Sequence, residues 1–168
     1  MYSRHMKFYF KLKSFLPLIT ILAVIIAFVI AKAYINQLFT YQSLMIDFMA
    51  GFFIVFGGFK LLKLSAFAEA YAMYDVLAIR SKIYAHIYPF IEIGLGLAFL
   101  FRFNTIMAAW ITLVLMMFNS IGAYNGIRDK KVLMCACLGT VFKLPMSFVS
   151  LGEDLLMAAM AVMIILGL

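Results

Sequence analysis

Cys135 and Cys137 are the only two cysteines in the 168-residue sequence, and a single residue separates them. A disulfide between residues this close would be strained, because the S–S bond restricts the geometry of the backbone that carries it. Two thiolates at this spacing can instead bind one soft metal ion, such as Cu(I), Hg(II) or Zn(II), or exchange with another protein's disulfide. Lys130, Lys131 and Lys143 lie nearby and would favour the thiolate form. The alternative without chemistry is that Cys135 and Cys137 are small apolar residues filling a connection.

Glu92 is a second candidate, because it is an ionisable residue near the middle of a long apolar run. Such a residue is costly inside a membrane and usually faces a bundle interior, a partner or water. Tyr88 precedes it by one helical turn and Gly96 follows it by one, so the three share a face. A proton relay, a cation ligand, and a hydrogen bond to Tyr88 or a neighbouring helix all fit these residues. His86 lies off that face and is predicted to form hydrogen bonds at the membrane interface.

The other candidate site residues are acidic groups near the ends of apolar runs. Asp75 follows Tyr74 and is expected to pair with Arg80 or Lys82, or to lie on a solvated face. Glu153 and Asp154 are expected to cap the last apolar helix, because negative charge is favourable at a helix N-terminus. The alternative for these two acids is that they face the basic segment that carries the cysteines.

The composition defines the class of protein that must position these residues. Hydrophobic residues make up 67% of the chain and charged residues 12%, whereas soluble domains have about half and about a quarter. Runs of roughly 20 apolar residues can cross a bilayer core of about 30 Å. The sequence therefore predicts an all-α integral membrane protein embedded in a lipid bilayer. The net charge of +7 does not indicate nucleic-acid binding, because the basic residues stand at the ends of apolar runs.

Five membrane spans are predicted, preceded by a basic tail at residues 1–15. The spans are residues 16–39, 44–62, 83–101, 105–124 and 149–168. Residues 63–82 are predicted to form one helix at the membrane interface, because Phe67, Tyr71, Tyr74 and Ala78 recur at helical spacing. Pro17 is expected in the first turn of its helix. Small residues at 51, 57 and 58 are expected to allow close approach of neighbouring helices.

The basic residues predict the orientation of the chain. Of 14 lysines and arginines, all but Lys32 and Arg102 lie in the tail, the second-to-third connection or the fourth-to-fifth connection. Five spans place these three segments on one side, and Lys60 is counted with the second of them. Basic segments stay in the cytoplasm. We therefore expect a cytoplasmic N-terminus and cysteine pair and a periplasmic C-terminus, in a bacterial inner membrane.

Several stretches resemble the MauE/DoxX superfamily of redox-associated membrane proteins. They are residues 48–53, 59–61, 67–68, 71–75, 88–92, 135–147 and 153–154. The resemblance covers roughly residues 45–168, and it is closest to a subgroup often linked to a heavy-metal-associated domain. It implies a four-helix membrane domain at residues 44–168, with residues 16–39 as an additional N-terminal transmembrane helix. This chain has only the short basic tail before its first span.

Three functions are consistent with these residues. In the first, Cys135 and Cys137 are redox thiols that exchange with a soluble partner protein. In the second, they are metal ligands of a Cu or Hg transporter or receptor, Glu92 lies on the ion path, and a soluble metal-carrier protein delivers the ion. In the third, the chain is a membrane scaffold without chemistry that binds another helix through its glycine faces.

Overall fold

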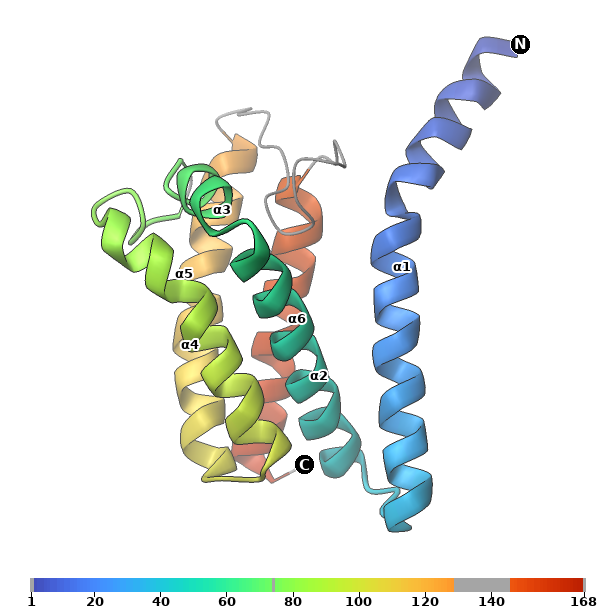
Figure 1. Cartoon of the computed structure of the whole chain (residues 1–168), viewed down its shortest axis with the longest axis vertical. Coiled ribbons are helices and arrows are strands. Elements are labelled where there is room, and N and C mark those ends of the chain that lie inside the picture. Colours follow the sequence, from blue (N-terminus) through green and yellow to red (C-terminus); the bar gives the residue numbers. More distant parts are fainter. Residues whose placement is uncertain (1, 74, 129–145, 168) are drawn as a thin grey trace.

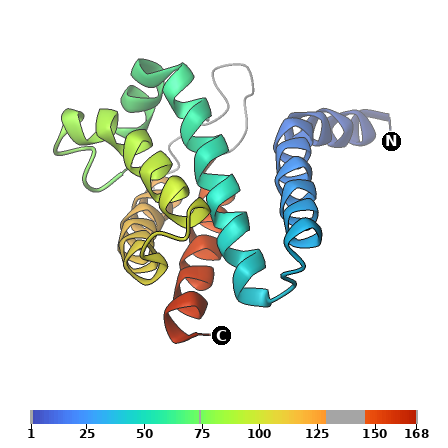
Figure 2. The ribbon, with the colours of Figure 1, turned by 60° about the horizontal axis from the view of Figure 1, so that its bottom comes forward.

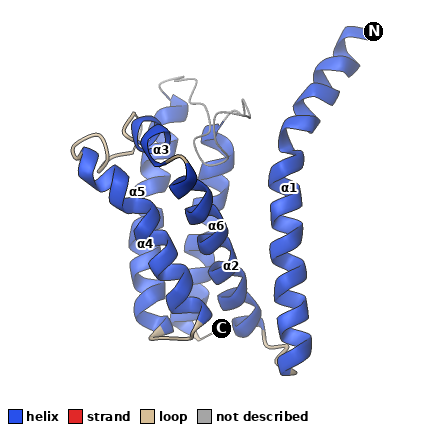
Figure 3. Cartoon of the chain, in the orientation of Figure 1, coloured by secondary structure: helices blue, strands red, loops and turns tan. Residues whose placement is uncertain are grey.

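The structure is a computed structural model that describes residues 2–73, 75–128 and 146–167, with side chains from residue 16 in the first helix and from residue 150 in the last. The described part contains six helices: α1 (Tyr2–Asn36), α2 (Tyr41–Leu62), α3 (Leu64–Tyr71), α4 (Lys82–Leu100), α5 (Thr105–Arg128) and α6 (Met146–Leu166). Figure 3 shows only helices and short connections in this part. Four stretches are long and apolar enough to cross a membrane: Leu16–Asn36, Tyr41–Leu62, Lys82–Leu100 and Thr105–Arg128. The chain is therefore an all-α protein with the helices of a membrane protein.

Helices α2, α4, α5 and α6 form a bundle in which successive helices run in opposite directions (Figure 1). α2 packs against α4 and α6, and α5 packs against the same two helices, so the four close a ring. α1 lies outside this ring and packs against α2 (Figures 1 and 2). The short α3 lies at one end, which we call the α3 end. The opposite end carries the α1–α2 and α4–α5 connections, and we call it the turn end (Figure 1).

Each predicted apolar span coincides with a helix, and most of the observed ends lie within a few residues of the predicted ones. The N-terminal end of α1 is the exception, because α1 begins at Tyr2 and continues through the predicted basic tail. Pro17 consequently lies inside α1 and not in its first turn. An internal proline removes one helical hydrogen bond and bends the helix. Figure 2 shows that α1 changes direction along its length.

The prediction of one interfacial helix over residues 63–82 is wrong. α3 ends at Tyr71, and residues 72–73 and 76–80 form turns. Asp75 stabilises these turns, because its Oδ1 accepts hydrogen bonds from the N–H groups of Leu77 and Ala78 at 3.0 and 2.8 Å. Local side-chain bonds of this kind compete with a helix.

Two glycines allow α2 and α4 to approach closely. A Cβ on Gly57 of α2 would lie 2.9 Å from Ile93 Cγ1, and one on Gly96 of α4 would lie 2.8 Å from Ile54 Cγ1. On α1, the side chain of Ile25 packs against Gly51 in the same way, at 3.0 Å. The predicted role of small residues is therefore confirmed at positions 51 and 57. It is wrong at Gly58, where an added Cβ would meet no atom of a described residue within 4 Å.

Candidate functional site

A buried ion pair joins α2 to α4 near the α3 end of the bundle. Lys60 lies in the last turn of α2, and its Nζ donates to Glu92 Oε1 at 2.5 Å and Oε2 at 2.7 Å. Lys60 is 8% exposed and Glu92 is 3% exposed. Lys60, which was counted with the charges of the second-to-third connection, is therefore buried in the bundle and pairs with Glu92. The hypothesis that Glu92 bonds to a neighbouring helix is confirmed.

Aromatic rings surround the ammonium group of Lys60. Its Nζ lies 4.9 Å from the ring centre of Tyr88 and 5.4 Å from that of Phe67. Tyr71 stacks on Phe67 at 5.1 Å and lies 4.7 Å from Tyr88, centre to centre. A cation over ring faces is attracted by their quadrupoles, and the attraction is strongest where water is excluded. Phe67 of α3 thus lies beside the Lys60 side chain of α2, and Tyr71, one helical turn later, stacks on Phe67.

Asn119 of α5 connects two of these tyrosines. Its Oδ1 accepts a hydrogen bond from the Tyr71 hydroxyl at 2.7 Å, and its Nδ2 donates to the Tyr88 hydroxyl. Asn119 is 5% exposed, so both contacts are shielded from water. Asn119 was not among the residues predicted from the sequence, because the span that contains it has no charged residue. An amide inside an apolar run is a comparable signal, since it too must find partners in the membrane. We call Lys60, Glu92, Phe67, Tyr71, Tyr88 and Asn119 the Lys60 cluster.

A cavity of about 40 Å³ adjoins the Lys60 cluster, and Ser150, Glu153 and Asp154 of α6 also line it. A cavity of this size has room for a few water molecules. Glu153 Oε1 is buried and accepts no hydrogen bond from a described residue. Four of the candidate residues named from the sequence, Tyr88, Glu92, Glu153 and Asp154, therefore face one small space. The expected capping role of Glu153 and Asp154 is wrong, because α6 begins at Met146 and places them inside the helix.

Asp75 and His86 lie apart from one another near the same end. Asp75 is 0% exposed, whereas Arg80 and Lys82 are exposed, so neither the expected pairing nor the solvated face is present. Burial raises the pKa of Asp75, and the hydrogen bonds from Ala78 and Leu77 oppose this increase. His86 is exposed, with Nδ1 2.8 Å from the Lys82 carbonyl oxygen. His86 therefore has a hydrogen-bonding partner, and its predicted place at the membrane interface stays a prediction.

Cys135 and Cys137 lie outside the described residues, so their predicted roles stay predictions. The segment that carries them, residues 129–145, connects the end of α5 to the start of α6, and both lie at the α3 end (Figure 1). Within residues 2–73, 75–128 and 146–167, no group of three or more His, Cys, Asp or Glu side chains could hold a metal ion.

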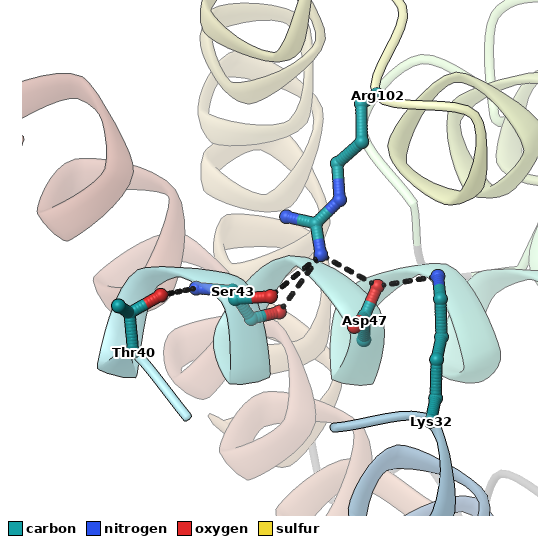
Figure 4. A network of polar contacts seen from close by, with 5 residues as sticks. All are labelled: Lys32, Thr40, Ser43, Asp47 and Arg102. Carbon is teal, nitrogen blue, oxygen red and sulfur yellow. Dashed lines mark hydrogen bonds and ion pairs between the residues drawn. The ribbon is translucent and has the colours of Figure 1, made fainter. Parts of the chain in front are cut away.

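A second polar cluster lies at the turn end (Figure 4). Asp47 Oδ1 of α2 accepts from Lys32 Nζ of α1 at 2.8 Å and from Arg102 Nη2 at 2.9 Å. The same Nη2 donates to Ser43 Oγ at 2.8 Å. Thr40 caps α2 beside it by accepting a bond from the Ser43 N–H. We call Lys32, Ser43, Asp47 and Arg102 the Asp47 cluster; it ties α1 and the α4–α5 connection to the start of α2.

Comparison with known families gives one match. The sequence model of the family described as "Methylamine utilisation protein MauE" matches residues 17–167. The matched region begins in α1 and therefore includes a helix that the resemblance over residues 45–168 did not cover. No curated protein and no solved structure matches the chain.

Proposed function

Because the chain belongs to the MauE family, we propose that it is a multi-pass membrane protein whose Cys135 and Cys137 exchange thiols and disulfides with a partner protein. The observation that carries this proposal is the position of the Lys60 cluster. It lies at the α3 end, where the cysteine-bearing segment joins α5 and α6. A lysine and three carboxylic acids around a water-sized cavity can accept and release protons, and thiol chemistry requires proton transfer.

The proposed topology has five spans in a bacterial inner membrane, with α6 as the fifth. The N-terminus, the α3 end and the cysteine pair lie in the cytoplasm, and the turn end and C-terminus lie in the periplasm. The distribution of charge supports this orientation. Among the described residues, Lys63, Arg80, Lys82 and Arg128 lie at helix ends or connections of the α3 end, whereas Lys32 and Arg102 lie at the turn end. Residues 44–168 form the four-helix domain, and α1 is an additional helix against its side.

The proposed reaction balances as follows. One thiol of the pair loses its proton, and the thiolate attacks a sulfur of the partner's disulfide, which releases a partner thiolate. The second thiol of the pair loses its proton and attacks the mixed disulfide, which releases the other partner thiolate. Two electrons pass to the partner and the two partner thiolates take up two protons. The resulting Cys135–Cys137 disulfide is strained and oxidising, so the same exchange readily runs in reverse, and the partner's two thiols then reduce it and regain their own disulfide.

The sequence contains no other cysteine, so single-cysteine variants test the reaction directly. Cys135→Ser and Cys137→Ser are each incubated in lipid nanodiscs with a disulfide-bonded peptide, and mixed disulfides are measured by mass spectrometry. We expect one variant to accumulate the mixed disulfide, because the resolving thiol is absent, and the double variant to form none. Absence of a mixed disulfide in every variant would contradict the proposal. Tight binding of Cu(I) or Hg(II) that the double variant loses would favour the metal-binding alternative.

Labelling of intact cells with a membrane-impermeant maleimide tests the topology. We expect Cys135 and Cys137 to react only after lysis. A matched control is the Cys-free double serine variant with Gly167→Cys, because five spans place position 167 outside, where it should react in intact cells. If the wild-type cysteines reacted from outside, or if position 167 were protected, the five-span orientation would be wrong.

A further inference from the structure

The turn end carries an excess of positive charge beside an open cavity. Lys32 and Arg102 both bind the single carboxylate of Asp47, so the Asp47 cluster has one cation more than it has anions. A cavity of about 570 Å³ adjoins it and is lined by Lys32, Ala33, Asn36, Leu38, Ser43, Asp47, Leu100 and Arg102. This volume lies within the range of about 300–1,000 Å³ that is usual for small-molecule sites.

Hydrogen bonds hold the guanidinium of Arg102 in place, but they involve only one of its three nitrogens. All its hydrogen bonds to described residues come from Nη2, and a guanidinium has further N–H donors on Nε and Nη1. Figure 4 shows these nitrogens turned away from Asp47. The backbone of Arg102 has a φ of +57°, a conformation that is costly for a residue with a side chain. Asp47 and Ser43 thus fix an arginine whose free donors remain available for an anion.

Exposed apolar residues accompany the residues that line this cavity. Leu38 lines it and is 51% exposed. Ile35 precedes Asn36 in the sequence, and Phe101 and Phe103 stand on either side of Arg102; these three are 77%, 74% and 76% exposed. A free inorganic anion gains nothing from such neighbours. A molecule with a phosphate group and hydrocarbon chains matches both parts of the surface.

We propose that the turn end binds the phosphate of an anionic phospholipid. Arg102 and Lys32 hold the phosphate oxygens, Ser43 and Asn36 contribute neutral hydrogen bonds, and the flanking apolar side chains contact the glycerol and acyl chains. Basic pockets between membrane helices bind lipid head groups in this way. The site ties α1 to the bundle through the lipid as well as through Asp47.

Native mass spectrometry of the full chain, released from detergent with added phosphatidylglycerol, tests the site. We expect bound phosphatidylglycerol in the wild type and little diacylglycerol with the same acyl chains. Arg102→Gln and Lys32→Gln should each lower the affinity about tenfold, because each removes a charged hydrogen bond to the phosphate. Arg128→Gln is the matched control: it makes the same change at an exposed position of the α3 end and should leave binding unchanged. Lys32→Gln provides the test if Arg102→Gln fails to fold.

Inorganic phosphate distinguishes a lipid site from a free-anion site. An excess of phosphate should not displace phosphatidylglycerol, because it lacks the apolar contacts. Displacement by phosphate at concentrations similar to that of the lipid would overturn the proposal. Equal binding of phosphatidylglycerol and diacylglycerol, or wild-type affinity in both cation variants, would overturn it as well.

Discussion

Glu92 at the α3 end and Asp47 at the turn end each accept charged hydrogen bonds, but their partners differ in exposure. Lys60 is almost as buried as Glu92, with side-chain exposures of 10% and 3%. The side chains of Lys32 and Arg102 are 25% and 38% exposed, although Asp47 itself is only 3% exposed. One site is closed by aromatic rings, and the other opens to its surroundings through two long cationic side chains.

This difference determines what each ion pair contributes to stability. Removing one partner of a buried pair leaves an uncompensated charge in a medium of low dielectric constant. An exposed cation that loses its partner is solvated again, so its pair contributes little. The Lys60 cluster is therefore expected to hold the bundle together, whereas the Asp47 cluster leaves its cations available for a ligand.

Replacing Lys60 tests the closed site and should have the largest effect. We expect Lys60→Met to lower the free energy of unfolding by about 3–5 kcal/mol, because Glu92 is left buried without its cation. Unfolding in mixed micelles with increasing SDS measures this change. The double variant Lys60→Met/Glu92→Gln should lose less than Lys60→Met alone. If the loss in the double variant equalled the sum of the losses from Lys60→Met and Glu92→Gln measured singly, the pair would not be coupled. The comparison of the two ends would then fail.

The close contact of α2 with α4 brings Lys60 within reach of Glu92, and Gly96 is the residue to change. Gly96→Val should cost about 1–3 kcal/mol, since the new side chain would overlap Ile54 and overpack the interface. Gly94→Val on the same helix is the matched control, because an added Cβ there meets no atom within 4 Å in the described part of the chain. Equal losses for the two variants would show that helix propensity, and not the contact, is responsible.

The amide of Asn119 tests whether the hydroxyls of the closed site need their partners. We expect Asn119→Leu to cost about 1–3 kcal/mol, because the hydroxyls of Tyr71 and Tyr88 lose the hydrogen bonds that Asn119 now supplies. The comparison at the open end is Ser43→Ala, which removes one hydroxyl contact of the half-exposed Arg102 and should cost only about 0–0.5 kcal/mol, because this contact is partly exposed. Thermal unfolding of both variants in detergent gives the two values, and a smaller loss for Asn119→Leu would reverse the expected order.

The sequence was sufficient for the apolar helices but not for the partners of the charges. Runs of apolar residues identify the helices because length and composition suffice to cross a bilayer. The shared face of Tyr88, Glu92 and Gly96 was also predictable, since helical periodicity alone determines it. The partner of Glu92 was not, because Lys60 belongs to a different helix and its position near a helix end is also typical of a connection charge.

The acids of α6 show the same limit. Glu153 and Asp154 look like capping residues when the helix is assumed to start beside them, and only the observed start at Met146 places them against the cavity. Asp47 provides a third case, because a single acid near a helix end does not reveal that it binds two cations. Contacts between helices depend on the rotation and depth of each helix, and a single sequence does not specify these.

Loss of a cation from the Asp47 cluster should lower the free energy of unfolding only slightly, and this loss should depend on the salt concentration. We expect Arg102→Gln to lower the free energy of unfolding by about 0–1 kcal/mol in low salt, and by less as ionic strength rises and screens the pair. Lys60→Met should show no such salt dependence, because its environment excludes ions. Unfolding at two salt concentrations measures both. A loss from Arg102→Gln as large as that from Lys60→Met would show that the two ends do not differ in this way.

Asp75 completes the comparison, because this carboxylate is buried and forms no ion pair with a described residue. Burial raises its pKa above the unfolded value of 3.8, so the folded state binds a proton more tightly than the unfolded state does. Stability should consequently fall as the pH rises through the interval above that value. Asp75→Asn keeps the Oδ1 acceptor for Leu77 and Ala78 but cannot ionise. The wild type should therefore lose stability relative to Asp75→Asn as the pH rises above about 4, measured by thermal unfolding in detergent. A wild type that gained stability over this interval would mean that a cation compensates Asp75, as Lys60 compensates Glu92.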